Sequence, residues 1–180
     1  KIEDMIAESF NSEGVIFDLL RKFPEEEPVQ CVGAESSEDE PAPAAIEISA
    51  PVIRLANVII AQAIRMKASD IHIEHEEHAT QVRYRIDGDL RGMMKLPKYV
   101  GEGPLVSRIK IMANLDVADR RRPQDGRAKL VVGKQEVGLR VSTIPTAFGE
   151  KVVLRILDNR QAQSPLEAQG FRPEVLARMA

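Results

Sequence analysis

The feature that most constrains the fold of this chain is a Gly-Lys pair at positions 133–134, between two segments that alternate apolar and polar side chains. Glycine readily adopts the positive φ that a two-residue hairpin turn needs, so the pattern predicts an antiparallel β-hairpin. A two-residue turn places Leu130 opposite Val137 and Ala128 opposite Leu139. One face of the hairpin is therefore expected to be apolar, formed by Ala128, Leu130, Val132, Val137, Leu139 and Val141.

The opposite face of this hairpin is charged, and the same register sets Arg127 directly opposite Arg140. Like charges that face each other across a sheet repel, whereas a well-matched pair contributes about 0.2–1 kcal/mol. Three arrangements tolerate such a pair: the side chains splay into water, nearby carboxylates neutralise them, or an anion lies between them. The hairpin alone leaves all three open, although the planar donors of guanidinium suit phosphate oxygens.

Residues 50–158 contain the other predicted elements of one domain. Ser49 and Pro51 are typical of a helix start, and the apolar spacing predicts a largely buried helix through Lys67. Residues 69–74 alternate as a half-buried strand does. The remaining elements are a hairpin over 80–95, a helix from Pro104 to about Ala113, and a strand over 151–157.

The hairpin over 80–95 is predicted to turn through three residues, Asp87-Gly88-Asp89, because only an odd loop keeps its apolar residues on one face. This register sets Arg85 opposite Arg91. The whole order is then helix, three strands, helix, three strands. It predicts an α+β fold of two layers, in which antiparallel strands carry the helices on one face.

Regions of different character flank this domain. Residues 1–23 are interpreted as a helical remnant of a preceding domain, and residues 159–180 as a linker and the start of a following one. Residues 24–49 contain no Lys or Arg, and Glu and Pro recur along them. Such a composition buries too little apolar surface to offset chain entropy, so it predicts a flexible acidic linker.

Charge is unevenly distributed along the chain. Residues 1–49 hold 3 basic and 13 acidic side chains, whereas residues 50–180 hold 22 basic and 15 acidic ones. A positive half suggests a phosphate-bearing ligand or an acidic partner. Nucleic acid is not the expected partner, because the chain has no Trp, two Tyr and five Phe for stacking, and no recognisable DNA-reading motif.

The expected location is cytoplasmic. The single cysteine, Cys31, excludes an internal disulfide framework. No apolar run approaches the length of a membrane span, and the first residues lack the pattern of a signal peptide.

Side chains that could ligate metals or act as nucleophiles are interpreted as structural. The histidines fall on opposite strand faces and in a loop, without a matching second cluster, so no metal site is expected; they are His72, His75 and His78. Three aspartates near the arginine run are expected to form ion pairs; they are Asp116, Asp119 and Asp125. Ser142-Thr143 has no histidine base, and no glycine-rich loop ends in Lys-Ser or Lys-Thr, so the chain alone is not expected to hydrolyse a nucleotide.

Several strings in collinear order resemble one family, the secretion ATPases of bacterial type II secretion and type IV pilus assembly. The similarity covers about residues 50–158 and corresponds to the N2 domain that precedes the ATPase core in that family. The strings are ASDIHIE (68–74), VRYRIDG (82–88), VSRIKIMANLDVADRRRPQDGR (106–127), LRVST (139–143) and GEKVVLRILD (149–158).

The resemblance implies a PAS-like N2 domain of a hexameric motor that lies in the cytoplasm, peripheral to the bacterial inner membrane. In that family, ATP hydrolysis in a RecA-like domain powers pseudopilus or pilus assembly and protein secretion. The implied partners are that ATPase domain, neighbouring subunits of a homohexamer, and platform proteins of the inner membrane. ATP and Mg²⁺ would be cofactors of the longer parent, because the chain stops before the family's Walker A motif and is expected to bind neither alone.

The resemblance also implies roles for particular residues. Arg127 and Arg140 match family positions that reach nucleotide phosphates, and Arg155 is a third candidate for that contact. Three adjacent arginines are assigned to a domain or subunit interface: Arg120, Arg121 and Arg122. The alternative is a PAS-like protein-interaction module that makes no nucleotide contact.

Overall fold

The computed structural model describes residues 20–21, 29–31 and 49–157. Seven strands in this part form one antiparallel sheet in the order β1-β5-β6-β7-β2-β3-β4. Their bounds are β1 Val29–Cys31, β2 Asp70–His75, β3 Ala79–Ile86, β4 Asp89–Pro97, β5 Gln124–Val132, β6 Gln135–Thr146 and β7 Gly149–Leu157. The helical segments are α2 Ala50–Arg65, α3 Lys98–Val100, the π-helical η1 Gly101–Leu105 and α4 Val106–Met112.

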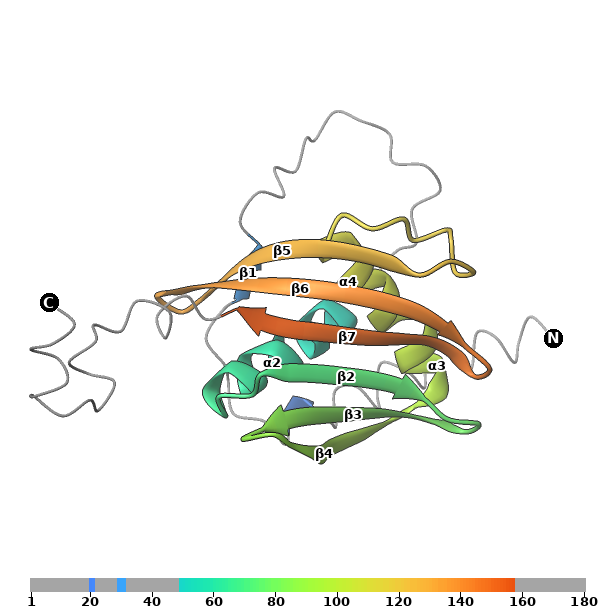
Figure 1. Ribbon diagram of the computed structural model, residues 1–180, viewed down its shortest axis with the longest axis horizontal. Helices are drawn as coiled ribbons and strands as arrows, with labels where there is room; N and C mark the ends of the chain where they lie inside the picture. Colours follow the sequence, from blue (N-terminus) through green and yellow to red (C-terminus); the bar gives the residue numbers. More distant parts are fainter. Residues whose placement is uncertain (1–19, 22–28, 32–48, 158–180) are drawn as a thin grey trace, which may run out of the picture.

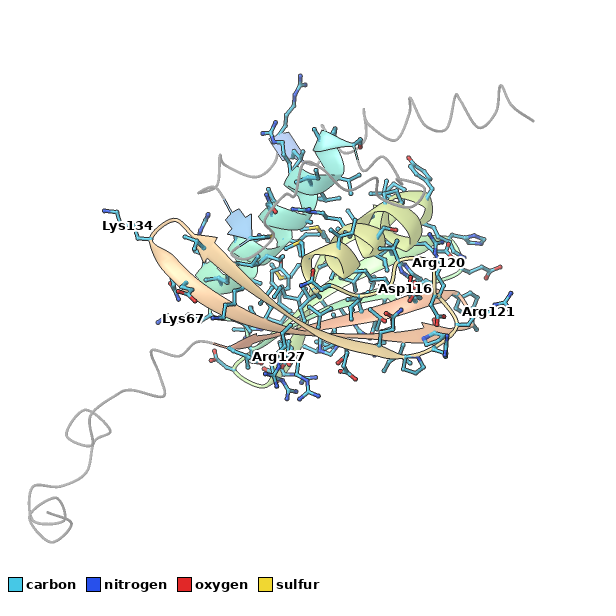
Figure 2. All side chains as sticks on the ribbon, turned by 90° about the horizontal axis from the view of Figure 1, so that it is seen from above. Lys67, Asp116, Arg120, Arg121, Arg127 and Lys134 are labelled. Atoms are coloured by element: carbon cyan, nitrogen blue, oxygen red, sulfur yellow. The ribbon has the colours of Figure 1, made fainter. Side chains whose placement is uncertain are left out.

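The architecture has two layers, with the helices gathered on one face of the sheet (Figures 1 and 2). Helix α2 precedes the meander β2-β3-β4, and the segment α3–η1–α4 precedes the meander β5-β6-β7. The two meanders are joined side by side, because β7 pairs with β2 in the middle of the sheet. The predicted α+β fold of antiparallel strands with helices on one face is confirmed.

The core lies between the two layers. Alternate residues of the strands point to the helices, as Ile71, Ile73 and Leu154 do, and all three are buried. Helix α2 buries a stripe that includes Leu55 and Ile59 against them. The hydroxyl of buried Tyr84 donates to the backbone oxygen of Ile59 at 2.7 Å, which ties the sheet to this helix.

The register of the β5–β6 hairpin agrees with the prediction. Gly133 adopts a φ of 61°, and Val132 pairs with Gln135 across the two-residue turn. Arg127 therefore pairs with Arg140. We call the sheet side away from the helices the outer face, and Figure 2 shows Arg127 projecting from it.

The three-residue turn predicted for the β3–β4 hairpin is wrong. The turn has two residues, Asp87 and Gly88, whose φ angles of 53° and 88° are both positive, as a tight primed turn requires. Arg85 thus pairs with Leu90, not Arg91. A register shift near Val82 leaves Met93 as the extra residue of a bulge. The bulge places Met94 opposite Val82 on the apolar face, whereas Leu90 lies opposite Arg85 on the other face.

The helix predicted to begin at Pro104 begins earlier. It starts with α3 at Lys98, and Pro104 lies inside η1. Proline lacks the amide hydrogen that the regular α-helical ladder uses, and the ladder is interrupted by this π-helical turn at the place where Pro104 lies. Gly101 opens this segment, where a Cβ would overlap the Thr80 side chain of β3.

The acidic region 24–49 contains a strand. Residues Val29–Cys31 form β1, which pairs with β5 from Val132 to Leu130 at one edge of the sheet. The strand takes only three residues of an uncharged run, 28–34, and this pattern is too short to stand out from the acidic composition around it. Of the predicted remnant 1–23, Leu20 and Arg21 are helical and Leu20 joins the core; the rest, like 159–180, lies outside the described residues, and the domain boundaries stay a prediction.

No helix in the described part of the chain combines the length and apolar character needed to cross a membrane.

Candidate functional site

A single row of charged residues crosses the outer face of the sheet. Arg127 on β5 pairs with Arg140 on β6, which pairs in turn with Arg155 on β7. Arg155 pairs with Asp70 on β2, and Asp70 pairs with Arg85 on β3. Residues opposite each other on neighbouring strands have Cβ atoms about 4.5–5.5 Å apart. We call these five residues the arginine row: it brings four guanidinium groups and one carboxylate together across five adjacent strands.

Asp70 neutralises one end of the row. Its carboxylate lies 2.9 Å from Nε of Arg155 and 3.5 Å from Nε of Arg85, and Ser69 Oγ donates to it at 2.8 Å. The side chain is only 8% exposed. Burial alone would raise the pKa of Asp70, but the hydrogen bonds from Arg155 and Ser69 outweigh burial and hold this pKa below its usual value.

The other end of the row carries positive charge with little compensation. Arg140 Nη2 lies 3.8 Å from Oδ1 of Asp125, and both side chains are more than half exposed; such a pair contributes little. The same carboxylate accepts a hydrogen bond from Ser142. Within the described residues, Arg127 makes no ion pair. Two neighbouring guanidinium groups therefore point into solvent with most of their donors available, an arrangement suited to a bidentate anion.

The basic residues around the row are mostly paired. Glu74 binds both Arg83 and Lys151, the latter at 2.6 Å. Lys129 lies 3.9 Å from Glu136 on the neighbouring strand. The surplus of positive charge is therefore concentrated at Arg127 and Arg140, and it is not a general property of the outer face.

The three histidines lie in different surroundings. His72 is half-buried on the outer face, where burial and then the charges of Lys151 and Arg85 lower its pKa. His75 is buried and its Nδ1 lies 2.7 Å from Thr80 Oγ1; burial is also the main cause of its lowered pKa. The third, His78, is exposed. Among the described residues, no three His, Cys, Asp or Glu side chains gather as a metal site would require.

The three adjacent arginines lie in the connection between α4 and β5. Figure 2 shows Arg120 and Arg121 apart from Arg127 of the row. Arg122 pairs with Asp119 at 2.7 Å, as predicted, whereas the ion pair predicted for Asp116 is not found among the described residues. The pKa of Asp119 is lowered, first by the backbone amide of Arg121 and then by the Arg122 side chain. Asp116 accepts backbone hydrogens of its own loop, and Asp125 approaches Arg140 on the sheet.

Two polar groups that matter were missed by sequence reasoning. One is Asp70, whose position beside Arg155 depends on the pairing of β7 with β2. The other is a buried pair in which Lys110 Nζ lies 2.5 Å from Glu150 Oε1. The only signal for Lys110 was its place in an otherwise apolar helix segment, IKIM, and this pattern is also typical of an exposed lysine.

The fold and the site define a class: a two-layer α+β domain that presents exposed guanidinium groups, little compensated by carboxylates, on one sheet face. Residues 46–180 match the sequence profile of a family described as type II/IV secretion system protein. This chain belongs to that family, which confirms the resemblance seen in its motifs.

Individual relatives agree with the family assignment. The type II secretion system protein HxcR of Pseudomonas aeruginosa is 52% identical over 128 residues, which are 71% of this chain and 27% of that protein. Type II secretion system protein E of Klebsiella pneumoniae is 48% identical over 72% of this chain and 26% of its own length. The type IV pilus assembly ATPase PilB of Myxococcus xanthus is 46% identical over 77% and 24%, respectively. The chain thus spans about a quarter of the relatives it matches.

Proposed function

We propose that this chain is the N2 domain of a secretion or pilus-assembly ATPase and that Arg127 and Arg140 contact nucleotide phosphates. The phosphates would be held, with Mg²⁺, by a RecA-like domain of the longer parent. This chain supplies only guanidinium groups. The observation that carries the proposal is the pair of facing, exposed arginines, of which Arg127 makes no ion pair within the described residues and Arg140 makes one exposed contact, with Asp125 at 3.8 Å.

The proposed role is electrostatic. Guanidinium donors close to a γ-phosphate stabilise the charge that redistributes as the phosphate leaves, and they act without proton transfer. They also favour the arrangement in which the two domains are closed on the nucleotide. Arg155 is the third candidate for phosphate contact, although Asp70 already engages its Nε at 2.9 Å.

The parent is proposed to work as a homohexamer in the cytoplasm, bound to platform proteins of the inner membrane. Hydrolysis would drive movement between the N2 and ATPase domains and so power pseudopilus or pilus assembly. The relatives named above support the link to secretion or pilus assembly, because one is described as a type II secretion protein and another as a type IV pilus assembly ATPase.

The test compares variants of the longer parent in a steady-state ATPase assay. Arg127→Ala and Arg140→Ala should each lower turnover about 10³-fold or more, the range known for arginines that act on a leaving phosphate. Lys129→Ala is the matched control, because Lys129 lies on the same face of β5, is exposed and pairs with Glu136; its turnover should not change. Turnover at the parental level in both arginine variants would refute the proposal and favour a protein-interaction module.

A further inference from the structure

An ion pair is buried between helix α4 and strand β7, and it is separate from the arginine row. Lys110 on α4 is 1% exposed, and its partner Glu150 at the start of β7 is 5% exposed. The ammonium also donates to the backbone oxygen of Asp119 at 2.8 Å. A buried ammonium has lost its hydration and is retained only where neighbouring groups satisfy it. Here those groups come from β7 and from the connection between α4 and β5.

The connection between α4 and β5 is held in place by several hydrogen bonds of its own. We call residues 116–123 the arginine loop. The Gln124 side chain clamps it in both directions: its amide donates to the backbone oxygens of Asp116 and Asp119 at 2.9 and 2.8 Å, and its oxygen accepts from the Asp116 amide at 2.9 Å. Asp119 Oδ1 accepts the backbone hydrogens of Arg121 and Arg122 at 3.0 and 3.2 Å. The buried ammonium and the Gln124 amide thus converge on one carbonyl.

The fixed loop presents two arginines to solvent. Arg120 and Arg121 are exposed, and neither makes an ion pair within the described residues. Figure 2 shows both at the end of the sheet, with Arg121 pointing away from the domain. Arg120 also lines a pocket of about 140 Å³ together with Glu102, Pro145, Thr146, Gly149 and Glu150. The lysine's own partner therefore forms part of the surface beside the loop.

We propose that Lys110 is a positioning residue for an interaction surface made by Arg120 and Arg121, and that this surface binds carboxylates of a partner protein. The inference rests on the proposed function, in which this domain works beside a RecA-like domain and neighbouring subunits of a homohexamer. Two guanidinium groups held at fixed positions match separate carboxylates on an opposing protein.

A nucleic-acid partner fits less well. Glu102 and Glu150 lie beside Arg120 at the pocket, and Asp116 and Asp119 lie in the loop itself. These carboxylates would repel a continuous phosphate backbone, whereas a protein surface can place single acids where the arginines are and avoid the rest.

The positioning role is tested on the 180-residue chain by hydrogen exchange. Lys110→Met/Glu150→Gln neutralises both buried groups, so that neither substitution leaves an unpaired charge in the interior. Exchange at the amides of Arg121 and Arg122 should become tenfold faster or more. Lys129→Met/Glu136→Gln, which neutralises an exposed pair on the outer face, should leave those amides unchanged.

If the double variant fails to fold, Lys110→Gln is measured in the same way, because it keeps a donor but loses the charge and the reach of lysine. Unchanged loop exchange in whichever variant folds would overturn the positioning role and leave Lys110 as a space-filling core residue.

The interaction surface is tested in the longer parent by sedimentation. Arg120→Ala/Arg121→Ala should raise the concentration needed for assembly about tenfold, and Lys110→Met/Glu150→Gln several-fold. An effect of the arginine variant alone would overturn the role of Lys110. If neither variant changes assembly, the proposed interaction surface is overturned.

Loss of duplex DNA binding with normal assembly would assign the surface to nucleic acid instead. The ATPase turnover of the Arg127 and Arg140 variants is measured separately. A failure of the proposed function would appear in that assay, whereas a failure of the interaction surface would appear in the sedimentation assay.

Discussion

At the scale of the residue, Asp70 is the group on which the arginine row depends. It is the single carboxylate in the row, and it contacts both Arg155 and Arg85. Its low exposure makes these contacts stronger than those of an ordinary surface pair. The row is therefore divided into a neutralised part around Asp70 and an available part at Arg127 and Arg140.

Asp70→Asn should destabilise the domain by about 1.5–3 kcal/mol at pH 7, the range for hydrogen bonds to a charged group. The pKa of Asp70 is lowered on folding, so its stabilisation is complete above the unfolded value of about 3.9 and is lost as the pH falls through the folded value. The difference between variant and parent should thus shrink below about pH 4. Urea unfolding at pH 7, 5 and 3 measures it.

Asp125→Asn is the matched control for this prediction. Asp125 lies on the same face beside Arg140, but its side chain is 63% exposed, so its loss should cost less than about 1 kcal/mol. A penalty for Asp70→Asn that is the same at pH 3 as at pH 7 would contradict the charge-based account.

Sequence reasoning reached some of these residues and not others. The facing of Arg127 and Arg140 follows from one local turn and the alternation of strand side chains. Asp70 could not be found in this way, because its neighbour Arg155 is 85 positions away in sequence. Only the order of strands in the finished sheet brings the two together.

At the scale of the element, the helical segment around Pro104 shows how a close approach sets a local conformation. Gly101 lies against Thr80, whereas a Cβ on Gly103 would meet nothing within 4 Å. The sequence marked Pro104 as a helix start, which is the usual position of proline. The contact of Gly101 with β3 is a tertiary feature and left no periodic signal.

Gly101→Ala should destabilise the domain by about 1–3 kcal/mol, because the added methyl group overlaps the Thr80 side chain in a packed interior. Gly103→Ala, two residues away in the same segment, should be neutral or slightly stabilising, since alanine favours helix and space is available. Thermal unfolding of both variants compares them directly. Equal midpoints for the two would show that η1 shifts freely away from β3.

At the scale of the whole molecule, the sheet is one structure made from two meanders. The element types and their order were readable from periodicity, because each meander is local in sequence. The pairing of β7 with β2, and of β1 with β5, was not, since both join segments that are distant in the chain. The first pairing creates the row, and it also merges two apolar faces into one core.

A chain that ends at residue 123 should therefore fail to fold cooperatively. It would keep α2, β2-β3-β4 and α4 but lose β7, which covers the free edge of β2 and supplies Val152 and Leu154 to the core. Circular dichroism during urea titration should show a gradual change for the short chain and a single sigmoidal transition for the 180-residue chain. A sharp transition in the short chain would identify the first meander as an independent unit.

The three-residue strand β1 has a mechanical consequence. It precedes the domain in sequence, yet it pairs by backbone hydrogen bonds with β5, the strand that carries Arg127. Tension on the chain ahead of Val29 is therefore transmitted to that strand before it reaches α2. A pull along the ladder loads its few backbone hydrogen bonds together, whereas a sideways pull breaks them one after another and bares an unpaired edge.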